Sequence, residues 1–333
     1  MMREITIGFD TSNYTTSCAV FDGETGENSS RLLDVPEGAL GLRQSDALFA
    51  HVKRLPEVFS KLALNGTAIA VGASATPREI EGSYMPCFLA GASQGMILAK
   101  GLGIPYYAFS HQQGHVAAAA WSAGRMDILG SPLLCWHLSG GTTELLLVRP
   151  GAAAAPAGEG RLNSESKPLI PAGGDIRAAC IACEILGGTN DVSTGQLLDR
   201  AGNLLGLKFP SGAALDALAL EKVGGEEYFP KTDGMKFSLS GVEHKMKAMV
   251  SAGKQAGDIA YFALWAITSA IKAATLAARR QFGSLPVLFS GGVASSGFLR
   301  RALPDGIYAQ PCYSADNAMG TAILTYRTVK NDK

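Results

Sequence analysis

Two stretches decide the fold: GFDTSNYTTSCAVF at residues 8–21 and WHLSGGTTELLLV at residues 136–148. Each reads as an apolar strand, a turn of small polar residues and a returning apolar strand. Between them, helical spacing at 45–63 and 88–102 alternates with short apolar runs at 68–73 and 105–109, which favours a layered α/β fold. We therefore predict two related lobes whose turns face each other across a cleft.

The composition sets wide limits on function. The chain has 333 residues, 47% of them hydrophobic and only 17% charged, and its 29 basic residues balance 29 acidic ones. This excludes global disorder and gives no long-range attraction to nucleic acid or to an anionic membrane. The N-terminus has no signal-peptide pattern, and the longest apolar region, 259–278, is interrupted by polar residues, so a buried helix is expected there. We expect a cytoplasmic protein with no membrane association.

Three turns rich in Gly, Ser and Thr follow strand patterns, at 10–13, 139–143 and 290–295. Backbone N–H groups in such turns can hold phosphate oxygens, although plain strand-to-helix turns have the same composition. The sequence has no P-loop and no GxGxxG motif. A nucleotide-phosphate role shared by the three turns is the favoured prediction. The segment 151–174, rich in Ala, Pro and Gly, is expected to be a surface insertion.

The sequence HQQGH places His111 and His115 four residues apart. In a helix both imidazoles project from one face and can bind one metal ion. Asp316, ahead of a C-terminal helix predicted at 318–326, is the candidate third ligand. Two His and one carboxylate leave coordination positions open, as catalytic ions require. Two polar residues at a helix start are an equally good interpretation of the pair.

Three further features have weaker patterns. Asp199 is predicted to start a helix, where its carboxylate either binds a ribose hydroxyl or is a plain surface acid. The basic stretch 234–247 is a candidate RNA contact, with a solvated helix face as the alternative. Cys180 and Cys183 form a lone CxxC, for which no role is the default expectation.

Seven motifs occur in an order that resembles the threonylcarbamoyl transferase (TsaD) family of the actin-like ATPase superfamily. They are IGFDTSNYTT (7–16), HQQGH (111–115), SGGTTELLLV (139–148), GQLLDRAGNLLGLKFPSG (195–212), FSLSGVEHKM (237–246), FSGGVASSGFLR (289–300) and YSADNAMGTA (313–322). The resemblance implies two actin-like (ASKHA, ribonuclease H-like) lobes, 1–128 and 129–312, with a nucleotide and metal cleft between them. The insertion near 151–174 would lie in the second lobe, and 313–333 would form a helix packed back on the first.

The same resemblance implies an activity and a site. The family transfers a threonylcarbamoyl group from its adenylate to N6 of the adenosine beside the anticodon of ANN-decoding tRNAs. One Fe²⁺ (or Zn²⁺) ion would be held by His111, His115 and Asp316 and would polarise the carbamoyl carbonyl. Asp10 and Ser139 are expected to be catalytic. The bound nucleotide would be ATP or threonylcarbamoyl-adenylate, contacted by Ser139, Gly140, Gly141, Thr142, Thr143, Asp199, Gly212, Gly291, Gly292 and Ser296.

The implied partners are tRNA, a smaller actin-like paralogue (TsaB-like) that pairs through the first lobe, and a partner ATPase (TsaE-like); a homodimer is also open. Five positions depart from the family pattern: Tyr14, Thr15, Gln113, Thr142 and Ser296. We expect changed polar residues among them to line the cleft. These departures favour a second hypothesis, a non-catalytic or re-purposed paralogue that binds nucleotide and metal in complex assembly or acts on another acceptor. A zinc protease is disfavoured because HQQGH lacks the general-base Glu of HExxH.

Overall fold

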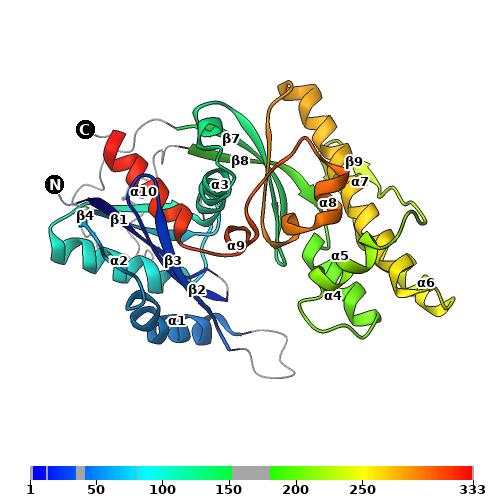
Figure 1. The fold of residues 1–333 in the computed structure, drawn as a ribbon, viewed down its shortest axis with the longest axis horizontal. Coiled ribbons are helices and arrows are strands. Elements are labelled where there is room, and N and C mark those ends of the chain that lie inside the picture. The colour runs from blue at the N-terminus through cyan, green and yellow to red at the C-terminus, as the bar shows by residue number, and fades with distance from the viewer. Residues whose placement is uncertain (1–2, 13, 35–41, 81, 152–180, 332–333) are drawn as a thin grey trace. The chain divides into compact units, whose positions relative to one another are not determined.

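A computed structural model describes residues 3–12, 14–34, 42–80, 82–151 and 181–331 of the chain (Figure 1). These residues divide into two compact units. The first comprises Met1–Ser131, Arg149–Cys183 and Asp316–Lys333, and the second comprises Pro132–Val148 and Glu184–Ala315. All but the first residue of the insertion predicted at 151–174 lies outside the described residues.

The first sheet has five strands in the order β3-β2-β1-β4-β5. The β1–β2 and β2–β3 pairs are antiparallel, whereas the β1–β4 and β4–β5 pairs are parallel. The apolar runs seen in the sequence form its buried central strands. The five strands are β1 (Glu4–Asp10), β2 (Thr15–Phe21), β3 (Gly26–Leu32), β4 (Thr67–Thr76) and β5 (Tyr106–Ser110).

Within the described part of the first unit there are four α-helices, α1 (Gln44–Phe59), α2 (Phe88–Leu102), α3 (His111–Ser122) and α10 (Met319–Asn331), with a short 3-10 turn at Met126–Gly130. The last helix lies directly on β1, because a Cβ on Gly8 would come within 2.6 Å of the Ala322 nitrogen. The Thr6 hydroxyl also donates a hydrogen bond of 2.8 Å to the Ala322 carbonyl. The C-terminal helix is thus part of the same core as the N-terminal strand.

The second sheet has seven strands in the order β12-β11-β6-β7-β8-β10-β9. Its part β8-β7-β6-β11-β12 repeats the strand order of the first sheet, with an antiparallel β6–β7 pair and parallel β6–β11 and β11–β12 pairs. The similar openings in the sequence therefore mark two sheets of one topology. The strands are β6 (Leu133–Leu138), β7 (Thr143–Pro150), β8 (Ile181–Thr189), β9 (Thr232–Asp233), β10 (Lys236–Phe237), β11 (Val287–Ser290) and β12 (Ile307–Tyr308).

The long helix α7 (Ala256–Phe282) forms the centre of the second core. Among the described residues it is the one helix long and apolar enough to cross a membrane, and 67% of its apolar window is buried inside the protein. The buried helix predicted at 259–278 is confirmed. The other helices of this unit are α4 (Thr194–Leu204), α5 (Gly212–Leu220), α6 (Ser240–Ser251), α8 (Gly297–Ala302) and α9 (Pro311–Ser314), with a 3-10 turn at Gly292–Ser295.

Candidate functional site

Helix α3 begins at His111 because a capping box fixes its first turn. The Ser110 hydroxyl accepts a hydrogen bond from the Gln113 backbone N–H at 3.2 Å, and the Gln113 side-chain oxygen accepts one from the Ser110 N–H at 2.8 Å. The two reciprocal bonds satisfy backbone donors that a helix start leaves open. His111 and His115 therefore lie one turn apart on one face, as the sequence predicts.

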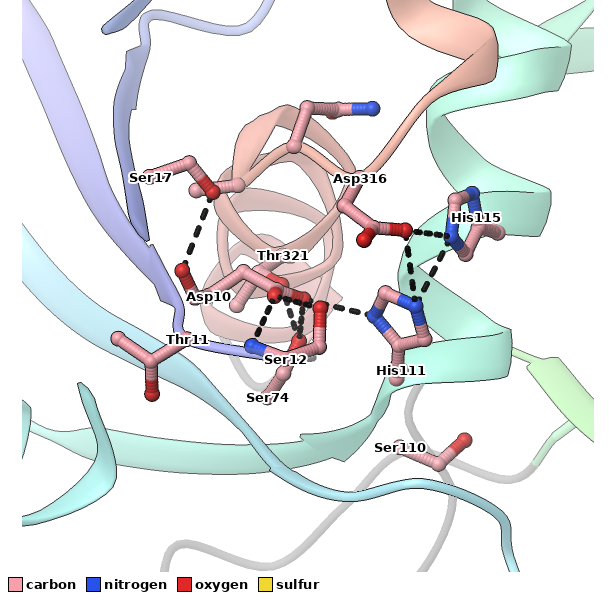
Figure 2. Close-up of polar contacts among 12 residues, drawn as sticks. Asp10, Thr11, Ser12, Ser17, Ser74, Ser110, His111, His115, Asp316 and Thr321 are labelled. Atoms are coloured by element: carbon pink, nitrogen blue, oxygen red, sulfur yellow. Dashed lines mark hydrogen bonds and ion pairs between the residues drawn. The ribbon is translucent and has the colours of Figure 1, made fainter. Parts of the chain in front are cut away.

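Both imidazoles point at Asp316, just ahead of α10 (Figure 2). The Nε2 atoms of His111 and His115 are 2.9 Å apart, and Asp316 Oδ1 is 3.3 Å from His115 Nε2 and 3.5 Å from His111 Nε2. Ligand atoms about 2.1 Å from one ion lie roughly 2.9–3.5 Å apart for bond angles of about 90–110°. The spacing and chemistry of this His–His–carboxylate set therefore fit a single divalent metal ion.

Asp10 at the end of β1 supports His111 from behind (Figure 2). The His111 Nδ1–H donates to Asp10 Oδ2 at 2.9 Å. Asp10 is buried and also accepts bonds from the Ser12 N–H at 2.8 Å, the Ser12 hydroxyl at 2.5 Å and the Ser74 hydroxyl at 2.5 Å. A carboxylate behind a ligand histidine fixes the ring and keeps the proton on Nδ1, so Nε2 faces the ligand position.

The pKa values show a site built for positive charge. Burial alone would raise the pKa of Asp10, but the charge of His111 and the hydrogen bonds lower it. Burial opposes a charged His111, yet Asp10 and Asp316 raise its pKa to about 10. Burial and the neighbouring His111 lower the pKa of His115, so it stays neutral. Asp10 and Asp316 thus stabilise positive charge on His111.

The close approach of α3 and α10 depends on Gly320, which contacts the backbone of Gly114. A Cβ on Gly320 would lie 1.8 Å from the Gly114 carbonyl oxygen and 2.6 Å from its carbonyl carbon. Gly114 lies between the two ligand histidines, and Gly320 follows Asp316 by four residues. The absence of a side chain at Gly320 lets the two segments pack backbone to backbone, whereas a Cβ on Gly114 would make only ordinary contacts, the nearest at 3.5 Å.

In the second unit, the turn between β6 and β7 is held against the start of α4. The Ser139 N–H donates to the Thr142 carbonyl at 2.8 Å, and the Thr142 N–H donates to the Ser139 hydroxyl at 3.0 Å. The Ser193 hydroxyl then donates to the Gly140 carbonyl at 2.6 Å. A Cβ on Gly195 would come within 2.6 Å of the Gly140 Cα. The turn is therefore rigid, with its glycines at the surface.

A cavity of about 440 Å³ opens beside this turn, within the usual size range of small-molecule sites. Five of the residues predicted to bind nucleotide line it: Gly140, Asp199, Gly212, Gly292 and Ser296. A Cβ on Gly140 or Gly292 would meet nothing within 4 Å, so backbone is open to the cavity there. The other predicted residues, Ser139, Gly141, Thr142, Thr143 and Gly291, are not among its lining residues.

Two of these other positions have clear structural roles. Thr143 is buried, and its hydroxyl accepts a hydrogen bond from the Thr194 N–H at 2.8 Å. Gly291 has φ +89°, and a Cβ there would lie 2.2 Å from the Leu138 carbonyl oxygen. Only glycine fits such a position without strain.

Sequence reasoning missed Asp216 as well as the two serines that bind Asp10. Asp216 lines the cavity from α5 and accepts bonds from the Ser296 hydroxyl, the Gly297 N–H at 2.8 Å and the Phe298 N–H at 3.1 Å. Its spacing of four residues from Gly212 in the helical stretch was the available signal. Ser296 is the N-cap of α8.

Two predictions about local placement were wrong. Asp199 lies in the middle of α4, not at its start, because the capping box of Ser193 and Gln196 begins the helix earlier. Its carboxylate accepts a 2.9 Å bond from the Ser211 N–H. Gln113 does not line a cleft, because it is fully buried in the cap of α3, where its amide also donates to the Ile181 carbonyl at 2.9 Å.

Among the described residues, the structure assigns no binding or metal site to the remaining candidates from the sequence, the CxxC pair and the basic stretch. Cys183 is buried, and Cys180 lies outside the described residues. In the basic stretch, the Lys247 ammonium pairs with Glu243 at 2.7 Å, and the Lys245 ammonium lies 4.4 Å from the centre of the Tyr228 ring. RNA contact by this stretch stays a prediction.

Comparison with known proteins gives consistent matches. A family model described as TsaD, tRNA N6-adenosine threonylcarbamoyltransferase, matches residues 154–323. A protein of that name from Enterococcus faecalis is 28% identical over 279 residues, covering 77% of this chain and 70% of the relative. One from Chlorobium luteolum is 28% identical over 360 aligned residues, covering 96% and 92%.

Among solved structures, component A of the (R)-2-hydroxyglutaryl-CoA dehydratase of Acidaminococcus fermentans is similar, with a TM-score of 0.54 and 15% identity over 99% of both chains. That likeness concerns the fold alone. Together with the repeated strand order, it confirms the predicted actin-like α/β fold.

Proposed function

The chain belongs to the TsaD family of tRNA N6-adenosine threonylcarbamoyltransferases, and from this premise we propose its specific reaction. It transfers a threonylcarbamoyl group from threonylcarbamoyl-adenylate to N6 of the adenosine beside the anticodon of ANN-decoding tRNAs. The observation that carries the proposal is the convergence of His111, His115 and Asp316, with Asp10 buried behind them. A plain structural cluster does not need three ligand atoms aimed at one point with a second carboxylate in support.

In this proposal His111 and His115 hold one Fe²⁺ or Zn²⁺ ion through Nε2, and Asp316 holds it through its carboxylate. When bound, the ion supplies Lewis-acid polarisation of the carbamoyl carbonyl. Asp10 is a positioning residue: its contact with Nδ1 fixes the His111 ring and tautomer. Ser12 and Ser74 keep the Asp10 carboxylate ionised by donating hydrogen bonds to it.

The second unit binds the nucleotide, either ATP or the adenylate. The glycine turns at Gly140 and Gly292 present backbone to the phosphates, and the Ser139 hydroxyl keeps the first turn closed. Asp199 Oδ1 accepts the Ser211 N–H, so Oδ2 is the oxygen we assign to a ribose hydroxyl. The roles of Gly212 and Ser296 follow from their positions in the cavity wall.

We assign the protein to the cytoplasm and expect it to act on tRNA together with a smaller actin-like paralogue and a partner ATPase. A second candidate function, a re-purposed paralogue without transfer activity, has one observation in its favour. Two of the changed positions, Gln113 and Ser296, have capping roles, and the Ser296 hydroxyl is bonded to Asp216. Such a protein would bind metal and nucleotide without modifying tRNA.

The test is a transfer assay with unmodified ANN-decoding tRNA, preformed threonylcarbamoyl-adenylate and the partner proteins of the same organism. The variants are Asp316→Ala and, as a matched control, Asp305→Ala, an exposed acid of the second unit. We expect modified tRNA from wild type and Asp305→Ala but not from Asp316→Ala. Wild-type protein with stoichiometric metal and no product would reject the transferase in favour of the second candidate. Full activity of Asp316→Ala would reject the metal ligand assignment.

A further inference from the structure

Phe209 is the most unusual residue of the cavity wall. It lies in the loop between α4 and α5 and lines the cavity, yet its side chain is 82% exposed. Keeping an apolar side chain in water rather than burying it costs about 25 cal/mol for each Å² of exposed surface. An aromatic ring that both lines a cavity and is exposed is available for contact with a ligand.

The other lining residues are of two chemical kinds. Open backbone at Gly140 and Gly292 suits phosphates, and the carboxylate of Asp199 suits a ribose hydroxyl. Apolar side chains come from Leu198, Pro210, Ala213 and Val293. A ligand that fills the cavity therefore has an anionic, hydroxyl-bearing end and a flat apolar end. A purine nucleotide has this form.

We propose that Phe209 is a nucleotide-binding residue that stacks on the purine ring of the bound nucleotide. This inference rests on the proposed function for the presence of a nucleotide in the cavity, and deepens it by assigning the contact with the base to Phe209. Aromatic rings stack on bases through their π-faces, and removing the ring weakens binding by roughly 5- to 150-fold for each base. The ring needs no hydrogen bond to do so, which agrees with its exposed position.

The experiment measures ATP binding by calorimetry for wild type and for Phe209→Ala, Phe209→Leu and Phe209→Tyr. Phe229→Ala is the matched control, because Phe229 is a 68% exposed aromatic residue of the same unit that is not among the lining residues. Melting temperature is recorded for each variant. We expect Ala and Leu at 209 to weaken ATP binding by about tenfold or more, and Tyr at 209 to stay within about twofold of wild type.

Several results would overturn the inference. One is wild-type affinity in Phe209→Ala, and another is full affinity in Phe209→Leu, since apolar bulk would then suffice. A fall in melting temperature that accompanies the loss of ATP affinity would assign Phe209 a role in folding and reject the inference. Failure of the wild-type protein to bind ATP would also reject the inference. If ATP binding depends on Phe209 as expected but no tRNA is modified, the inference stands and the proposed reaction fails.

Discussion

Gly320→Ala is the sharpest test of how the proposed metal site is built. The added methyl would lie 1.8 Å from the Gly114 carbonyl oxygen, whereas real Cβ contacts stay above 3.0 Å, so α3 and α10 must move apart by about 1.2 Å. The clash is with backbone and no side chain can rotate away. Overpacking of this kind costs about 3 kcal/mol, the top of its usual range. For a unit of this size, that lowers the melting temperature by roughly 6–12 °C.

The larger effect falls on metal binding. Gly320 follows Asp316 by four residues, so the shift of α10 carries the carboxylate away from His111 and His115. Metal sites tolerate ligand displacements of only about 0.2 Å. We therefore expect zinc affinity to fall by about 100-fold or more, as though the carboxylate ligand had been removed.

The assay pairs zinc titration calorimetry with thermal unfolding of the metal-free protein. Gly101→Ala is the control, because a Cβ there, near the end of α2, would meet nothing within 4 Å. It should bind zinc as wild type does and gain up to about 1 kcal/mol of stability. Wild-type zinc affinity in Gly320→Ala would refute the argument that backbone contact between α3 and α10 sets the ligand geometry.

Three further predictions follow from single contacts. Asp10→Asn should weaken zinc binding by about 10- to 100-fold in calorimetry with little change in fold; unchanged affinity would remove Asp10 from the site. Gly291→Ala, at φ +89° and against a backbone carbonyl, should lower the free energy of unfolding in urea by at least about 2 kcal/mol. Gly292→Ala should change it by no more than about 1 kcal/mol, and equal losses in the two variants would contradict this prediction. Burial would raise the pKa of Asp191, but hydrogen bonds, first that from Ser238, hold it well below its usual value. Its stabilisation is therefore present above about pH 4, the unfolded pKa, and is lost progressively on acidification. The difference in urea stability between wild type and Asp191→Asn should be full at pH 7 and shrink steadily from about pH 4 to pH 2; a constant difference would exclude the carboxylate as the cause.

Much of the fold could be predicted from short-range patterns in the sequence. The hairpins after Asp10 and Ser139 follow from short-range alternation of apolar and polar residues, and the order of strands and helices follows from periodicity. The ligand pair in HQQGH is equally local, since a helix alone places His111 and His115 together. Asp316 was predicted as the third ligand from its position before a helix and from the family resemblance, and the structure places its carboxylate 3.3 Å from His115 Nε2 and 3.5 Å from His111 Nε2.

What the sequence could not predict depends on contacts between distant segments. Asp10 and His111 are 101 residues apart, and no periodicity shows that the carboxylate of one strand meets the ring of a later helix. The same holds for Gly114 and Gly320, whose importance lies in backbone contact. Gln113 was wrongly predicted to line the cleft. It instead takes part in the cap at the start of α3, which depends on a local hydrogen bond to the Ser110 hydroxyl.

The packing of α10 on β1 has a consequence for synthesis of the chain. On the ribosome, β1 to β5 and α3 are made before the whole of the second unit, whereas Asp316 and α10 follow it. Asp316 lies 201 residues after His115, so a nascent chain carries the two histidines long before it carries the carboxylate. In the proposed metal site, binding by all three ligands therefore has to wait until translation has passed the second unit, and a chain that stalls earlier lacks the carboxylate ligand.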